Sequence, residues 1–244
     1  MYLVLGICTI LGLLVYKKGI LDGRGSFVAS LIGFLVYYFS GSFAWLSVLF
    51  IFLFVSFIAT KYKFEIKKKL RVSEGRSGQR NVVNVLANGL VFTAFAFLFY
   101  FGKYDLFKAG YLAALATVTG DTLSSEIGVL SRARPVLITN FKEVPPGTDG
   151  GITLKGEIAG IFGTLLIAFS AWVLGISSLG FALSASLIGG FLGFNFDSLM
   201  GAIFERHGLM GNASVNLISS IAGSIAGITA IIAIAALSIT TIAF

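Results

Sequence analysis

Two carboxylates and three hydroxyl groups lie together in the segment Asp121-Thr122-Leu123-Ser124-Ser125-Glu126, at the end of an apolar stretch. If this segment is helical, Asp121 shares a face with Ser125 and Thr122 with Glu126, because residues four apart are neighbours on a helix. Magnesium typically takes one or two protein carboxylates and completes its coordination with water and substrate phosphate. We therefore predict that Asp121 and Glu126 bind Mg²⁺, with Thr122 and Ser125 beside the substrate. The alternative is a helix cap at Asp121.

A loop rich in glycine and proline follows, from Lys142 to Thr153. Glycines permit backbone conformations that aim successive N–H groups into one anion-binding nest. Lys142 would add a point charge for phosphate, and Asp149 would be a further metal ligand or a base. The order of a Walker loop is absent, and a plain surface turn is the alternative. We predict that nucleotide phosphates bind at Gly147, Thr148, Gly150 and Gly151.

Short internal repeats point to a common site. The triplet Asp197-Ser198-Leu199 repeats the pattern of Asp121-Thr122-Leu123, and two further apolar segments each begin with a pair of asparagines one helical turn apart. We predict Asp197 as a further metal ligand and Ser198 as a substrate contact. The asparagines contact either the ligand or one another across helices; they are Asn84, Asn88, Asn212 and Asn216.

Two arginines are candidates for phosphate contacts. In Asp22-Gly23-Arg24-Gly25 the glycines allow close backbone approach and the guanidinium can bind phosphate oxygens bidentately, although an exposed turn fits equally well. Arg80 ends the basic segment 61–80. We predict that this segment is a surface helix or loop attracted to anionic lipid headgroups; the alternative is that its last residues bind nucleotide. It lacks interleaved aromatic residues, so no nucleic acid partner is expected.

The elements that must position these residues are apolar. Of 244 residues, 57% are hydrophobic and 12% charged, and the mean hydropathy is +0.94, far more apolar than a soluble domain. We predict an all-α, polytopic transmembrane helix bundle, a single integral membrane domain (1–244) with about eight spans, polar motifs at the helix ends and a motif loop at 121–156. The predicted apolar segments are 1–16, 26–40, 43–60, 82–101, 108–120, 157–176, 180–196 and 213–243.

Charge predicts the orientation and excludes some chemistry. With eight spans, all basic residues except Lys103 and Lys108 fall in one set of loops, which the positive-inside rule assigns to the cytoplasm. The motifs are then cytoplasmic and both termini are outside. Segment 1–16 is expected to be a span and not a signal peptide, because Lys17 and Lys18 follow it. One cysteine and one histidine make a disulfide, a zinc site or a haem site unexpected.

In this order, the motifs resemble those of an integral-membrane family that contains transmembrane protein 19 and the phytyl-phosphate kinase of plants and cyanobacteria. The resemblance rests on residues 22–25, 84–89, 120–128, 135–139, 144–151 and 197–201. It implies a kinase that transfers a phosphoryl group from a nucleoside triphosphate to a prenyl monophosphate. A more distant similarity to CTP-dependent polyprenol kinases and phosphatidate cytidylyltransferases implies CTP as the donor. The lack of a plant-type transit peptide favours a prokaryotic plasma membrane and a geranylgeranyl or similar substrate.

This resemblance implies roles for the candidate residues. The four carboxylates would hold Mg²⁺ or orient the acceptor, and Arg24, Arg80 and Lys142 would neutralise phosphates, while the prenyl tail stays in the bilayer. A cytidylyltransferase acting on a lipid phosphate would use the same groups. A transporter is less favoured, because transporters place their sites near the bilayer midplane and these carboxylates lie at helix ends. A scaffold or lipid-organising protein is least favoured.

Overall fold

The computed structural model describes residues 1–70 and 81–242, and most of these residues are helical. This confirms the predicted all-α class. The two short strands are β1 (Val136–Leu137) and β2 (Gly151–Ile152). The helices are α1 (Tyr2–Lys17), α2 (Gly23–Ser40), α3 (Phe43–Lys61), α4 (Phe64–Lys69), α5 (Val82–Gly102), α6 (Asp105–Gly128), α7 (Leu154–Val173), α8 (Leu179–Leu183), η1 (Ser184–Ile188), α9 (Gly189–Met200), η2 (Gly201–Glu205) and α10 (Asn212–Ile242), of which η1 and η2 are π-helical.

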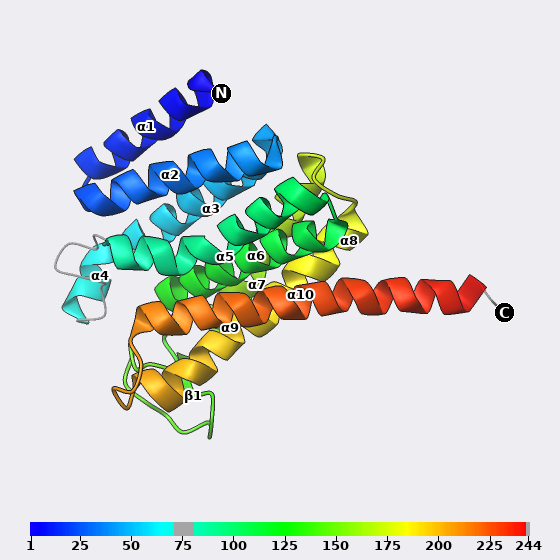
Figure 1. Cartoon of the computed structure of the whole chain (residues 1–244). Coiled ribbons are helices and arrows are strands. Elements are labelled where there is room, and N and C mark those ends of the chain that lie inside the picture. Colours follow the sequence, from blue (N-terminus) through cyan, green and yellow to red (C-terminus); the bar gives the residue numbers. More distant parts are fainter. Residues whose placement is uncertain (71–80, 243–244) are drawn as a thin grey trace.

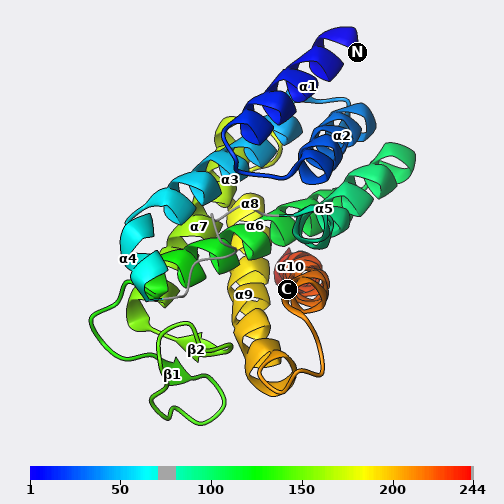
Figure 2. The same cartoon turned by 90° about the vertical axis from the view of Figure 1, so that its left-hand side faces the viewer.

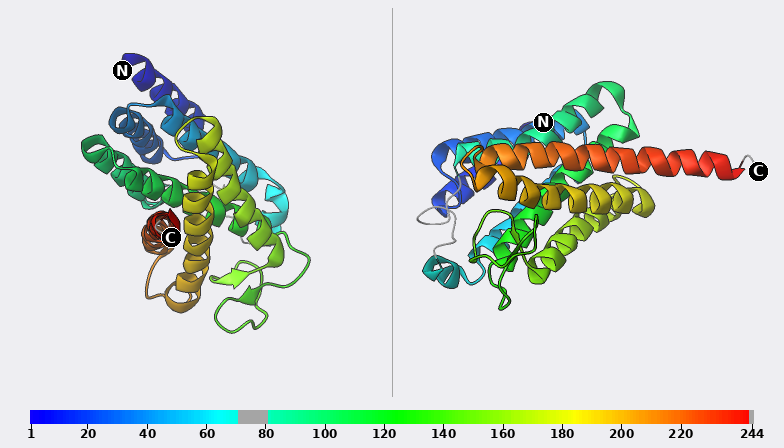
Figure 3. Two further views of the ribbon diagram at one scale, coloured as in Figure 1. Left: turned by 90° about the vertical axis from the view of Figure 1, so that its right-hand side faces the viewer. Right: turned by 90° about the horizontal axis from the view of Figure 1, so that it is seen from below.

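The long helices form an elongated bundle with two different ends (Figure 1). Helix α4, the loop that contains β1 and β2, and the turn between η2 and α10 lie at the same end, on the left of Figure 1. We call this the motif end. The last turns of α10 project from the opposite end, past the neighbouring helices (Figure 3).

Within the part of the chain that the structure describes, five helical segments are long and apolar enough to cross a membrane: Phe43–Lys61, Val82–Gly102, Leu154–Val173, Leu179–Glu205 and Asn212–Ser238. Helix α1 is apolar but shorter. Each predicted apolar segment overlaps a helix or, for 180–196, the consecutive elements α8, η1 and α9, but the predicted number of eight spans is not confirmed. Hydropathy marks helices that face lipid, whereas α6 is largely covered by other helices and carries buried polar residues such as Thr117 and Thr119.

Helix α6 is the central element of the bundle. It contacts α3, α5, α7, α9 and α10, and Figure 2, which looks onto the motif end, shows it among them. Small residues allow this close packing: a Cβ atom at Gly120 would lie 2.7 Å from the Phe194 ring of α9. The buried Tyr111 hydroxyl donates to the backbone oxygen of Trp45 in α3 at 2.7 Å. These contacts fix the position of the polar end of α6.

The helices extend further into the polar motifs than the hydropathy pattern predicts. Helix α6 continues to Gly128, and α7 begins at Leu154, where the Thr153 hydroxyl caps it by accepting the N–H of Gly156 at 3.0 Å. Both ends of the predicted motif loop, 121–156, are therefore helical. Polar residues can continue a helix when they face a cavity instead of lipid.

The remaining loop, residues 129–153, folds back onto the bundle. Its strands β1 and β2 pair antiparallel, with Val136 opposite Ile152 and Leu137 opposite Gly151. Leu137 and Val144 of the loop pack with Ala202 of η2 in a small apolar cluster. The loop is thereby held against the end of α9 (Figure 2).

Candidate functional site

A polar cavity of about 280 Å³ lies at the motif end. It is formed by the first turns of α5, α7 and α10, the last turns of α6, α9 and η2, and the loop 147–153. Most of the residues that the sequence singled out line it: Asn84, Asn88, Asp121, Thr122, Ser125, Glu126, Gly147, Thr148, Asp149, Gly150, Gly151, Asp197, Ser198, Asn212 and Asn216. Segments far apart in the chain thus meet in one hollow.

Acidic groups from several elements face this cavity. Asp121 comes from α6, Asp197 from α9 and Glu205 from η2. The Asp197 carboxylate is repelled electrostatically by both Asp121 and Glu205. Like charges held together in a poorly hydrated site are unfavourable unless a cation or proton compensates them. A cation or a proton bound among these carboxyl groups would reduce that repulsion.

Asparagines connect Asp197 to the other helices. In the orientation that satisfies its partners, the Asn216 amide nitrogen donates to Asp197 Oδ2 at 3.1 Å and to the backbone oxygen of Asn212 at 3.2 Å. In the same orientation, the Asn216 amide oxygen accepts from the Asn88 side-chain amide of α5 at 3.1 Å. The predicted alternative, hydrogen bonding between helices, is thus observed for Asn88 and Asn216, and both residues still line the cavity.

Glu126 has a partner that the sequence did not indicate. Lys67 of α4 is 1% exposed, and its Nζ donates to Glu126 Oε2 at 2.6 Å and to the backbone oxygen of Ala59 at 2.7 Å. Helix α4, within the segment that was predicted to lie at the membrane surface, thus inserts one lysine into the bundle beside the site. The ion pair compensates the Glu126 charge and fixes its carboxylate.

Replacing Lys67 with methionine is expected to lower the free energy of unfolding by about 3 kcal/mol, because the partly buried Glu126 carboxylate loses its counter-charge. Thermal unfolding of the purified protein in detergent measures this. Lys68→Met, on the exposed side of the same helix, is the control and should change little. The double variant Lys67→Met/Glu126→Gln should recover part of the loss. Equal unfolding midpoints for the Lys67 and Lys68 variants would contradict the assignment.

The glycine-rich loop differs in part from the predicted nest. Gly147 and Gly150 have left-handed backbone conformations, with φ of 82° and 75°. However, the N–H of Thr148 donates to the backbone oxygen of Pro145 at 3.3 Å, and that of Gly151 donates to Thr148 at 2.9 Å. These two N–H groups are used inside the turn and do not point into a nest. Among the described residues, no protein acceptor is found for the N–H groups of Asp149 and Gly150.

Asp149 lies at the rim of the cavity, where its side chain keeps contact with solvent. Partial desolvation there raises the pKa of its carboxyl above the ordinary value. A cation in the cavity would favour the ionised form of this group and so act against that shift.

Some predicted site residues do not line the cavity. The Asp22 side chain caps α2, accepting the N–H of Gly25 at 2.6 Å, and Arg24 is exposed beside it. Lys142 is exposed in the tight turn that follows β1, next to Phe141, which has a φ of 55°. Arg80 lies outside the described residues.

The cavity also contains acidic residues that the motifs did not identify. Glu157, in the first turn of α7, lines it and accepts the Asn195 amide of α9 at 3.2 Å. In the sequence Glu157 looks like an ordinary acidic residue at a helix start, where it would stabilise the helix dipole. Glu205 follows the Asp197 motif within the π-helical turn η2, and such turns are frequent at functional sites.

The donor set of the cavity fits a hard cation with few protein ligands. Among residues 1–70 and 81–242, no group of three or more acidic, histidine or cysteine side chains forms a ready-made metal cluster. Mg²⁺ does not need one, since it usually binds through one or two carboxylates and completes its shell with water and phosphate oxygens. Asp121 and Asp197 fit that requirement.

Comparisons with known proteins give a consistent result. The family model described as "Integral membrane protein DUF92" matches residues 6–224. The uncharacterized membrane protein MJ0933 of Methanocaldococcus jannaschii is 40% identical over 225 residues, which cover 92% of this chain and 91% of that protein. Protein VTE6, chloroplastic, of Arabidopsis thaliana is 33% identical over 217 residues, 85% and 64% of the two chains. Protein PGR of the same plant is 30% identical, covering 79% and 75%. No solved structure matches the chain.

Proposed function

We propose, from the premise that this chain belongs to the integral membrane protein family DUF92, that it is a lipid-phosphate kinase. The enzyme transfers a phosphoryl group from a nucleoside triphosphate, CTP being favoured, to a prenyl monophosphate of the phytyl or geranylgeranyl type. The reaction takes place at the motif end, which faces the cytoplasm. One observation carries the proposal: carboxylates of α6 and α9 and the glycine-rich loop line the same cavity.

Two further points support it. The family resemblance includes the phytyl-phosphate kinase, whose substrate is a prenyl monophosphate. Phosphoryl transfer also depends mainly on positioning and charge neutralisation and asks for little covalent chemistry from the protein. The cavity offers acidic, amide, hydroxyl and backbone N–H groups and contains no histidine or cysteine among the described residues that line it. This composition suits a metal–phosphate reaction.

In the proposed reaction an oxygen of the lipid phosphate attacks the γ-phosphorus of the nucleotide. The bond from that phosphorus to the β–γ bridging oxygen breaks, so the products are a nucleoside diphosphate and a lipid diphosphate. Mg²⁺, when bound, supplies positive charge that neutralises the phosphate oxygens. Asp121 and Asp197 would hold it, and Asn216 orients Asp197. A general base is unnecessary, because the attacking phosphate oxygen is already anionic.

The remaining residues have supporting roles. The backbone N–H groups of Asp149 and Gly150 donate to the nucleotide phosphates. They replace the larger nest of N–H groups that the sequence predicted. The ion pair with Lys67 holds the Glu126 carboxylate in place, so we assign Glu126 a positioning role beside the metal site. Arg24, Arg80 and Lys142 are not needed in this scheme.

A cytidylyltransferase that acts on a lipid phosphate is the alternative, because the same groups would serve it. The two reactions differ in the phosphorus atom that is attacked. Purified protein in lipid vesicles is incubated with geranylgeranyl monophosphate and CTP labelled at either the α- or the γ-phosphorus. We expect label in the lipid product only from γ-labelled CTP. Label from the α-phosphorus alone would identify a cytidylyltransferase, and lipid without label from either position would exclude both.

A further inference from the structure

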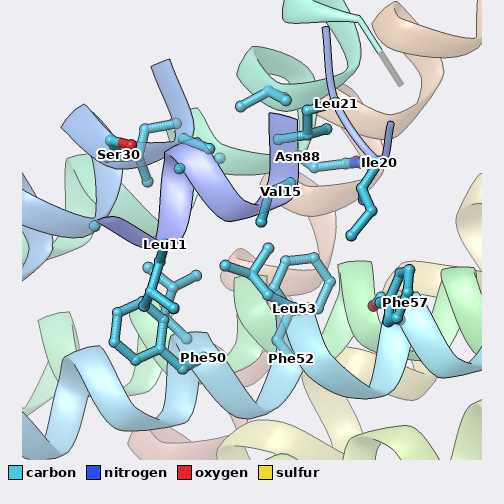
Figure 4. Close-up of a pocket in the computed structure, with 18 of the residues that line it drawn as sticks. Leu11, Val15, Ile20, Leu21, Ser30, Phe50, Phe52, Leu53, Phe57 and Asn88 are labelled. Carbon is cyan, nitrogen blue, oxygen red and sulfur yellow. The ribbon is translucent and has the colours of Figure 1, made fainter. Parts of the chain in front are cut away.

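An apolar cavity of about 160 Å³ lies beside the polar one, between α1, α2, α3 and α5. Its walls are mostly aliphatic and aromatic. In Figure 4, Leu11 and Val15 of α1 point toward Phe50 and Leu53 of α3. Small residues leave the space open, namely Gly12, Ala29, Gly33 and Ser56. The buried Ser56 hydroxyl has no hydrogen-bond partner among the described residues.

The two cavities share part of their lining. Asn84 and Asn88, in the first two turns of α5, line both of them. Asn88 is also linked through Asn216 to Asp197, the carboxylate that we assign to the metal. Thr60 and Lys61, at the end of α3, line the apolar cavity on this side. The apolar cavity therefore adjoins the polar site along an edge that is polar and includes one cationic side chain, Lys61.

We propose that this cavity holds the isoprenoid chain of the lipid monophosphate, with its phosphate placed at Asn84 and Asn88 facing the nucleotide. This inference rests on the proposed function, and it adds the location at which the acceptor, the prenyl monophosphate, binds. The amphiphilic lining matches this ligand: an apolar chain beside α1 and α3, and an anionic head at the asparagines and Lys61. A soluble phosphorylated metabolite would leave the apolar walls unused.

The size of the cavity should determine which lengths of isoprenoid chain it accommodates. Residues 49–60 of α3, which form one wall, span roughly 16 Å at the rise of an α-helix. A chain moving from the bilayer into this cavity gains little from the hydrophobic effect, because lipid is equally apolar. The cavity therefore acts through fit: it aligns chains that it accommodates and excludes chains that it does not.

Filling the cavity tests the proposal. Ala29→Phe places a ring in the lining of the cavity, whereas Ala94→Phe places the same ring on the exposed side of α5, away from it. The ratio of kcat/KM for geranylgeranyl monophosphate to that for geranyl monophosphate should fall about tenfold in Ala29→Phe, because overpacking affects the longer chain more. In Ala94→Phe the ratio should stay at its wild-type value. An unchanged ratio in Ala29→Phe, with turnover retained, would overturn the proposal.

A second measurement does not depend on turnover. Wild-type protein is irradiated with a geranylgeranyl monophosphate analogue that carries a diazirine near the end of its chain, and the labelled peptides are mapped. Labelling within α1–α3 that unlabelled geranylgeranyl monophosphate suppresses, and that Ala29→Phe diminishes, is expected even if no phosphoryl group is transferred; in that case only the kinase assignment fails. Phosphoryl transfer together with labelling confined to α7–α10 would be consistent with a kinase but would overturn the proposal that the isoprenoid chain binds in the apolar cavity.

Discussion

Asparagine in place of Asp121 is expected to reduce phosphoryl transfer to the lipid by at least about a hundredfold, because a metal contributes several kcal/mol to stabilising the charge of the transition state. The fold should remain intact. Asparagine has nearly the same size and shape as aspartate, so the thermal unfolding midpoint of the metal-free protein should stay close to that of the wild type. Initial rates and unfolding curves of the same preparation measure both effects.

The matched control lies at the other end of the same helix. Asp105, in the first turn of α6, has a 70% exposed side chain and pairs with Lys108 at 2.8 Å. An exposed ion pair of this kind contributes roughly 0–1 kcal/mol, so Asp105→Asn should retain normal transfer. Near-normal turnover in Asp121→Asn, or an equal loss in both variants, would show that Asp121 does not hold the metal.

Alanine in place of Gly150 is expected to reduce transfer by about a hundredfold, which is the effect of displacing a reacting group by about 1 Å. Two causes act together. A side chain at a φ of 75° is strained, and its Cβ would lie 2.5 Å from the backbone nitrogen of Ala202. The loop must therefore move away from η2, and the N–H groups of Asp149 and Gly150 move with it.

Gly175 separates the two causes. It has the same φ of 75°, but an added Cβ atom would have no neighbour within 4 Å, and the residue sits in the turn between α7 and α8. Gly175→Ala should show only the backbone strain, about 1–2 kcal/mol in stability, with transfer retained. Comparable transfer in the two alanine variants would mean that contact between the loop and η2 does not position the phosphates.

Much of the site could be predicted from residue types and their order. Asp121, Asp197 and the asparagine pairs stand out because polar side chains in apolar membrane helices are energetically costly. Such side chains therefore usually face a cavity or the interior of the bundle. Their placement at helix ends predicted that they would share one region, and in the structure they line one cavity. The repeated Asp-Ser/Thr-Leu pattern related the end of α6 to that of α9. The helical segments themselves followed from hydropathy, with errors of a few residues where helices continue into the cavity.

Other features depend on tertiary contacts that no local pattern reveals. Lys67 is one of several lysines in α4, and only packing distinguishes it as the buried partner of Glu126. The N–H groups of Thr148 and Gly151 are used within their turn, which composition cannot show. The apolar cavity arises where Gly12, Ala29 and Ser56 meet across three helices. The number of spans is also difficult to predict from hydropathy. The central helix α6 is enclosed by other helices, so its side chains need not be as apolar as those that face lipid.

Transfer of the γ-phosphoryl group of CTP to geranylgeranyl monophosphate, with and without Mg²⁺, is the most direct test of a shared metal–phosphate site at the ends of α6 and α9. Wild-type protein in vesicles should form γ-labelled geranylgeranyl diphosphate only when Mg²⁺ is present. Label that appears equally after chelation of divalent cations, or no labelled diphosphate from any nucleoside triphosphate and prenyl chain tried, would contradict that site.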